Sequence, residues 1–116
     1  MSISYEGIGE WCATFVCGAV SEGDIVKVSA NGTVGKCTAG DGFCGVVAAM
    51  GRDGKACSVQ LGGLVRVPYS GETAPAVGWN LLAADGNGGV SVVNSGGHSY
   101  LAVEVDTTGK TMTIML

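Results

Sequence analysis

Residues 42–71 read GFCGVVAAMGRDGKACSVQLGGLVRVPYSG, and they contain two apolar runs separated by the turn signal Arg52-Asp53-Gly54. Such a turn between apolar runs predicts a β-hairpin. From residue 57 to residue 69 the odd positions are apolar apart from Gly63, and the even positions include Ser58, Gln60 and Arg66. This period of two is typical of a half-buried strand. The phase continues through Gly62-Gly63, where a two-residue hairpin would instead bring apolar and charged positions onto one side. We therefore expect one long strand bent at these glycines, as at a barrel corner.

The rest of the chain consists of further short strand-like segments between turn residues. Strands are expected at residues 12–17, 24–30, 33–37, 79–84, 90–93, 100–105 and 111–116. We expect Val26 and Val28 to face inward, and Asn31-Gly32 to form a type I′ hairpin turn. No segment has a helical period or a helix cap before an apolar stripe. The fold is therefore predicted to be all-β, a small β-barrel or sandwich of short antiparallel strands.

The second half of the chain repeats the first. A shift of 55 residues pairs Gly42 with Gly97 and Gly54 with Gly109. The same shift pairs the inward residues Cys57, Val59 and Leu61 with Met112, Ile114 and Leu116. One extra residue in the turn at 85–89 also aligns the two Asn-Gly pairs, at 31–32 and 87–88. We interpret this as two similar β-units, the alternative being a general resemblance among glycine-rich β sequences.

Length and charge limit the class of protein. With 116 residues the chain fits one domain, which we place at residues 12–116 behind an extended arm at 1–11. The net charge of −4 and the scattered basic residues argue against nucleic-acid binding. The longest aliphatic run, at 46–50, is far too short to span a bilayer, and no signal peptide is expected. Only 14% of residues are charged, which favours a surface partly covered by a partner.

The cysteines are odd in number and lack metal-binding spacing. They are Cys12, Cys17, Cys37, Cys44 and Cys57. A disulfide framework would need an even set in a secreted chain, and a structural zinc site would need four ligands at characteristic spacings. We therefore expect reduced cysteines that act as small apolar core residues, and no metal site.

No pattern of residues predicts catalysis or a cofactor. Residues 40–45 match G-x-G-x-x-G, but a strand-like run follows instead of a helix, and no acid stands at the ribose position. The glycines are better explained by turns and close strand approach. His98 is the only histidine and has no local partner for a metal or a triad. Glu104 is mid-strand, opposite the apolar face of residues 101–105, and is expected to be solvated. We expect a protein that is not an enzyme.

The N-terminal arm is the best candidate for a contact with a partner. It lacks any period, yet it carries Ile3, Tyr5 and Ile8 and ends at Trp11. A segment of this kind cannot bury such side chains by folding alone. The four residues are therefore candidates for a capsid or subunit interface, the alternative being a strand paired within its own domain.

The order of strand motifs resembles the capsid cement, or head decoration, proteins of tailed bacteriophages. The resemblance rests on Gly-Asp-Ile-Val-Lys-Val at 23–28, Gly-Val-Val-Ala at 45–48, Val-Gln-Leu-Gly-Gly-Leu-Val-Arg-Val-Pro at 59–68 and Val-Gly-Trp at 77–79. It covers roughly residues 12–116. The family often repeats Gly-Val-Ala late in the chain, where this sequence has Tyr-Leu-Ala-Val at 100–103.

The resemblance implies a small β-barrel-like protein that binds the outside of an assembled phage head and stabilises it, often as a trimer. It implies the major capsid protein as partner, the virion exterior as location, synthesis in the bacterial cytoplasm, and no catalytic residues. Two alternatives remain open. One is another virion β-module, from a tail or baseplate, and the other is a carbohydrate-binding or enzymatic β domain.

Overall fold

The computed structural model describes residues 10–116, which form ten strands and no helix. The strands are β1 (Trp11–Cys17), β2 (Ile25–Ala30), β3 (Thr33–Lys36), β4 (Gly45–Met50), β5 (Ala56–Gly62), β6 (Leu64–Ser70), β7 (Gly78–Ala84), β8 (Val90–Val92), β9 (His98–Asp106) and β10 (Thr111–Met115). The all-β prediction is confirmed. Within this described part, no helix could cross a membrane.

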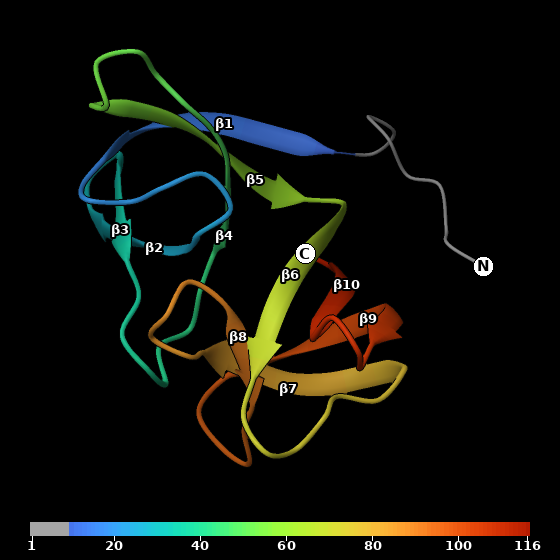
Figure 1. Cartoon of the computed structure of the whole chain (residues 1–116). Coiled ribbons are helices and arrows are strands. Elements are labelled where there is room, and N and C mark those ends of the chain that lie inside the picture. Colours follow the sequence, from blue (N-terminus) through green and yellow to red (C-terminus); the bar gives the residue numbers. More distant parts are fainter. Residues whose placement is uncertain (1–9) are drawn as a thin grey trace.

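The strands close into two five-stranded barrels with the same topology (Figure 1). The N-terminal barrel has the order β1-β3-β2-β4-β5, and the C-terminal barrel has the corresponding order β6-β8-β7-β9-β10, read around the closed ring. Neighbouring strands are antiparallel except for one parallel pair in each barrel, β1 with β3 and β6 with β8. The two predicted β-units are therefore real, although the strand orientation is mixed.

The repeat extends to strand register. In the N-terminal barrel Val47 pairs with Val59, and a bulge at the next residue separates this pair from Ala49 and Ser58. In the C-terminal barrel Ala102 pairs with Ile114, and a bulge again follows before Glu104 and Thr113. Each of these positions differs from its counterpart by 55 residues. The spacing found in the sequence is thus the structural repeat, and the bulge belongs to it.

Gly63 connects the barrels without a hairpin. Its φ is +88°, a backbone conformation that favours glycine, and it separates β5 from β6 by a single residue. β5 pairs with β1 and β4, whereas β6 pairs with β8 and β10. The expected bend is confirmed, but the segment is two strands in two sheets rather than one long strand, and the bend carries the chain directly from one barrel into the other (Figure 1).

The two cores differ in composition. The buried core of the N-terminal barrel contains residues of that barrel alone: Cys17, Val20, Val26, Val34, Val47, Cys57 and Val59. The core of the C-terminal barrel also includes four residues from the first half of the chain: Ile25, Cys37, Phe43 and Val46. Part of the outer surface of the N-terminal barrel therefore closes the interior of the C-terminal one.

Three local expectations were wrong. Val28 is 57% exposed although it keeps the phase of Val26 and is paired with the buried Val34, because β2 becomes exposed toward its C-terminal end. Asn31 does not have positive φ, whereas Gly32 does, at +65°, so the turn is not type I′. Cys12 is exposed rather than in the core, although all five cysteines are free.

Candidate interaction surface

One face of the C-terminal barrel carries a row of four apolar side chains across four strands, two of them exposed and two half-buried. Trp79 on β7 is paired with Leu101 on β9, which is paired with Met115 on β10, which is paired with Leu64 on β6. Directly paired residues project from the same face of a sheet. Trp79 is 69% exposed and Met115 is 44% exposed. We call these four residues the apolar row.

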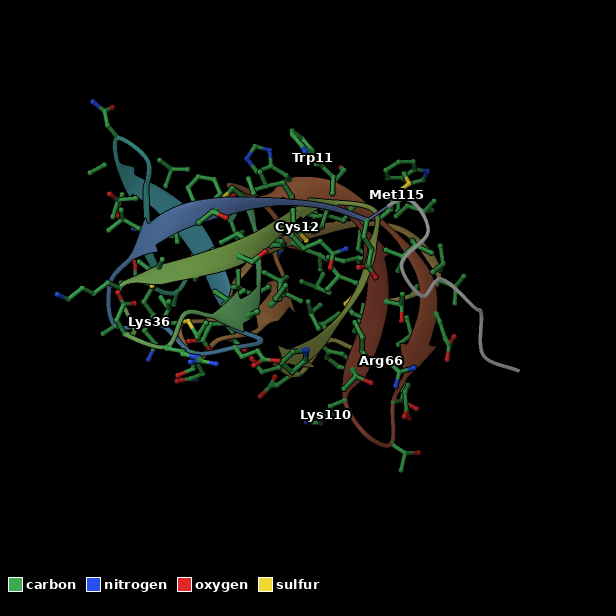
Figure 2. All side chains as sticks on the ribbon, turned by 90° about the horizontal axis from the view of Figure 1, so that it is seen from above. Trp11, Cys12, Lys36, Arg66, Lys110 and Met115 are labelled. Atoms are coloured by element: carbon green, nitrogen blue, oxygen red, sulfur yellow. The ribbon has the colours of Figure 1, made fainter. Side chains whose placement is uncertain are left out.

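Trp11 extends this surface toward the N-terminus. It is 64% exposed and is paired with Gly62, where an added Cβ would lie 3.6 Å from its ring. Gly62 is two residues from Leu64 of the row. Figure 2 shows Trp11 and Met115 projecting from the same side of the molecule. The predicted interface residue Trp11 thus lies near the row, whereas Ile3, Tyr5 and Ile8 lie outside the described residues.

A charged pair borders the apolar row along the strands. Thr113, two residues before Met115, is paired with Arg66 on one side and Glu104 on the other. The Arg66 guanidinium lies 3.8 Å from the Glu104 carboxylate, and Thr113 is only 1% exposed. Glu104 is therefore half-buried in an ion pair rather than simply solvated. An apolar centre with a polar border is typical of protein interfaces.

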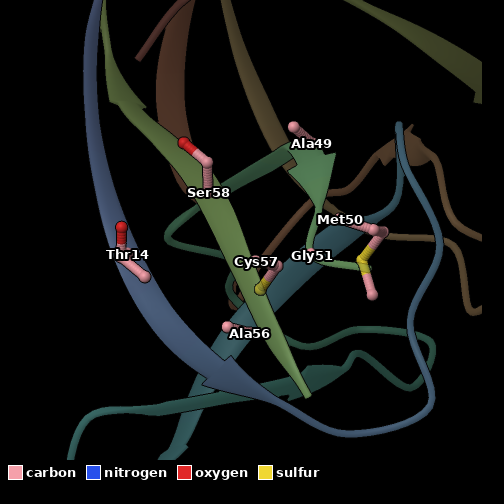
Figure 3. A pocket seen from close by; sticks show the side chains of 7 residues that line it. All are labelled: Thr14, Ala49, Met50, Gly51, Ala56, Cys57 and Ser58. Atoms are coloured by element: carbon pink, nitrogen blue, oxygen red, sulfur yellow. The ribbon is translucent and has the colours of Figure 1, made fainter. Parts of the chain in front are cut away.

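The corresponding place on the N-terminal barrel is hollow. Ser58, the counterpart of Thr113, is paired there with Thr14 on one side and Ala49 on the other. Thr14 thus takes the place of Arg66, and Ala49 takes the place of Glu104. These small side chains line a shallow hollow of about 250 Å³ together with Met50 and Cys57 (Figure 3). The lining has no charged group and no strongly perturbed acid or base beyond a buried thiol. It gives no basis for catalysis.

The contact between the barrels is organised by Asp41. Its carboxylate accepts hydrogen bonds from the Lys27 ammonium at 2.6 Å and from the Thr38 amide and hydroxyl, each at 2.9 Å. The bond from Lys27 is the main reason that the pKa of Asp41 falls to about 2, and the Thr38 donors lower it further. The loop fixed in this way pairs with β7: Gly40 donates to the Ala84 carbonyl and Ala84 donates to that of Asp41.

The residues considered for catalysis or cofactor binding are not brought together. His98 is exposed at the start of β9 and lies against Gly42. In the G-x-G-x-x-G stretch, Gly40 has φ of +89°, and a Cβ on Gly45 would lie 2.3 Å from the Gln60 carbonyl oxygen. Turns and close strand approach therefore account for these two glycines. Among residues 10–116 no three potential ligands gather as a metal site.

The buried thiols are poor nucleophiles. Burial, together with the neighbouring Asp41 carboxylate, raises the pKa of Cys37 to about 11. Burial, together with the neighbouring Cys17, raises the pKa of Cys57 to about 11. A thiol must ionise to attack an electrophile or bind a metal. These cysteines therefore serve packing, as expected.

The apolar row was missed from the sequence because of the bulge at Val103. The alternation placed Leu101 on the same face as Val105, but the extra residue separates them. Val105 packs against the core, whereas Leu101 joins the outer row. The repeat contained a usable signal, since the bulge lies 55 residues after the one at Ala48.

The sequence matches no protein-family model and no curated protein.

Proposed function

We propose that this chain is a head decoration protein of a tailed bacteriophage, which binds the outer surface of the assembled capsid and stabilises it. The observation that carries the proposal is the exposed apolar surface of Trp11 and the neighbouring row on a β-barrel chain with few charges. The order of strand motifs that resembles cement proteins supports it. The proposed partner is the major capsid protein, and the proposed location is the capsid exterior.

Cementing requires no chemistry, only selective binding. A protein that binds the assembled shell and not its free subunits shifts the equilibrium toward the shell. Several weak contacts across neighbouring subunits add avidity, so a homo-oligomer, with a trimer favoured, would bind more firmly than a monomer. The cluster of side chains needed for such binding is small, since a few buried aromatic anchors carry most interface energy.

Trp11 is the described residue that best fits a capsid anchor. Trp11 is exposed at the start of β1, where the pairing with β5 shifts register, and the arm with Ile3, Tyr5 and Ile8 directly precedes it. Burying an aromatic side chain of this size would contribute about 1.5–3 kcal/mol before ordering costs. We therefore assign capsid attachment to the arm and Trp11.

The test is co-sedimentation with expanded capsids of the phage whose genome encodes the chain. We expect the intact protein to sediment with the capsids and to raise their melting temperature. Deletion of residues 1–10, or Trp11→Ala, should weaken binding about tenfold or more, which corresponds to the loss of at least 1.4 kcal/mol. Val16→Ser is the matched control, because Val16 is 58% exposed at the other end of β1.

Two results would count against the proposal. An intact, folded protein that does not bind expanded capsids at saturating concentration would reject the decoration function. Normal binding by both arm variants, with unchanged melting, would leave decoration standing but reject the arm as the anchor. Loss of folding on deletion would place the arm within the domain's own sheet.

A further inference from the structure

The apolar row has a counterpart on the N-terminal barrel. There Ile25 is paired with Val46, Val46 with Gln60, and Gln60 with Cys12. These pairs lie on β2, β4, β5 and β1, the strands that correspond to β7, β9, β10 and β6. The two rows therefore occupy the same face of the repeated unit.

The counterpart row is largely covered, and the C-terminal barrel covers it. Ile25 is 1% exposed and Val46 is 4% exposed, because both are part of the C-terminal barrel's core. Gln60, 6% exposed, donates to the carbonyls of Gly62 and Leu64 at the connection between the barrels. The repeated unit thus has a face that another unit of the same kind can cover.

The covering surface lies at one end of the C-terminal barrel. Gly88 accepts a hydrogen bond from the Ile25 amide there, and Ala84 exchanges two with the 40–41 loop. Tyr100 stacks on Phe43, with ring centroids 4.8 Å apart, and donates to its carbonyl. We call this end of the barrel the seat.

The corresponding end of the N-terminal barrel is open. Val28 is paired with Val34 in the β2–β3 hairpin as Ala84 is with Val90 in the β7–β8 hairpin, so Val28 is the counterpart of Ala84 within the hairpin. Ala84 is buried, whereas Val28 is 57% exposed. Gly32, the counterpart of Gly88, is also exposed. Each chain therefore has one covered row in a filled seat, one open row and one open seat.

We propose that the apolar row of one chain docks on the open seat, around Val28, of a second copy of the same chain. The contact would repeat the arrangement that already joins the two barrels within one chain. It accounts for the exposed Trp79 and the exposed Val28 with a single occupant. It uses the apolar row that also supports the proposed function and specifies the contact of the homo-oligomer proposed there, but its test needs no capsid.

The contact joins two different surfaces, so it is heterologous. Such contacts close into rings or continue as open chains. The contact between two chains should be weaker than the contact between the two barrels of one chain. The exposed His98 would stand in it where the buried Phe43 stands within the chain, and the covalent connection through Gly63 would be absent. We therefore expect concentration-dependent assembly.

The first measurement is the mass in solution by sedimentation velocity over a range of concentrations. We expect the intact protein to exceed the monomer mass at high concentration. The row variant Trp79→Ser/Met115→Ser and the seat variant Val28→Asp should each lower that mass to the monomer. Arg52→Ala changes an exposed side chain in the β4–β5 turn, which contains no residue of either surface, and it should leave assembly unchanged. Circular dichroism and thermal melting confirm that each variant is folded.

The second measurement mixes the two variants. The row variant keeps an open seat and the seat variant keeps an open row, so an equimolar mixture should form a complex of one copy of each. A contact between two rows would give no such complex, and Val28→Asp alone would still assemble. The proposal is overturned by a wild-type protein that stays monomeric at its highest soluble concentration, by assembly that survives Val28→Asp, or by a mixture that remains monomeric.

Discussion

Replacing Phe43 by alanine tests whether the two barrels are one cooperative unit. Phe43 belongs to the first half of the chain, yet it is only 5% exposed and packs in the core of the C-terminal barrel. Its ring lies nearly parallel to that of Tyr100, with an interplanar angle of 11°. The substitution removes this ring from the junction and leaves a cavity there.

The expected loss follows from the burial of the ring. A buried Phe→Ala substitution costs about 3–5 kcal/mol, of which the aromatic pair accounts for roughly 0.5–1.5 kcal/mol. A domain of this size has a total stability of about 5–15 kcal/mol. With a urea m-value of about 2 kcal/mol/M, the midpoint should fall by about 1.5–2.5 M.

The assay is urea unfolding followed by far-UV circular dichroism. Phe43→Leu keeps most of the apolar volume and should lose roughly 1 kcal/mol, so it remains measurable if the alanine variant does not fold. His98→Ala is the matched control, because His98 occupies the corresponding position in the repeat but is exposed; it should change stability by less than about 0.5 kcal/mol. A Phe43→Ala midpoint within error of wild type, or a second transition that leaves one barrel unaffected, would refute the reasoning.

Two further predictions concern titratable groups. In the native protein Ellman's reagent should modify the exposed Cys12 rapidly, and it should modify the buried Cys37 and Cys57 only on unfolding. In denaturant it should find five thiols, and a smaller number would contradict the assignment of five free cysteines. Asp41→Asn should lower the melting temperature at pH 5–7. Because the folded pKa of Asp41 is about 2, against an ordinary 3.8, its stabilising effect is present above about pH 4 and disappears as the pH falls toward 2. The difference in melting temperature between wild type and variant should therefore shrink over that window, and a constant difference would contradict this.

Much of the fold could be predicted because turns and strand phase are local properties. The hairpin around Gly54, the bend at Gly63 and the 55-residue repeat each depend on glycine placement or alternation within a few residues. The positions of bulges are set by pairing between strands, which alternation within one strand does not reveal. For that reason alternation alone places Leu101 on the wrong face, whereas Val28 keeps its expected phase and is exposed because it lies toward the end of β2.

The candidate surface was only partly predictable. Trp11 was identified because it borders an aperiodic, aromatic-containing segment. The exposure of Trp79 and Met115 depends on which outer face the partner barrel covers, and this is a property of tertiary packing. Ile25 and Trp79 are both apolar in the sequence, whereas the fold buries Ile25 and leaves Trp79 open.

Only the C-terminal barrel has a core built from both halves of the chain, and this has a consequence for folding during synthesis. The N-terminal barrel contains all the residues of its own core, so it can form as soon as Gly62 has left the ribosome. Until the second half emerges, its Ile25 and Val46 face water and are open to wrong contacts. The C-terminal half has no such independence, because its core includes four side chains made earlier. The first barrel thus serves as a template on which the nascent second barrel closes.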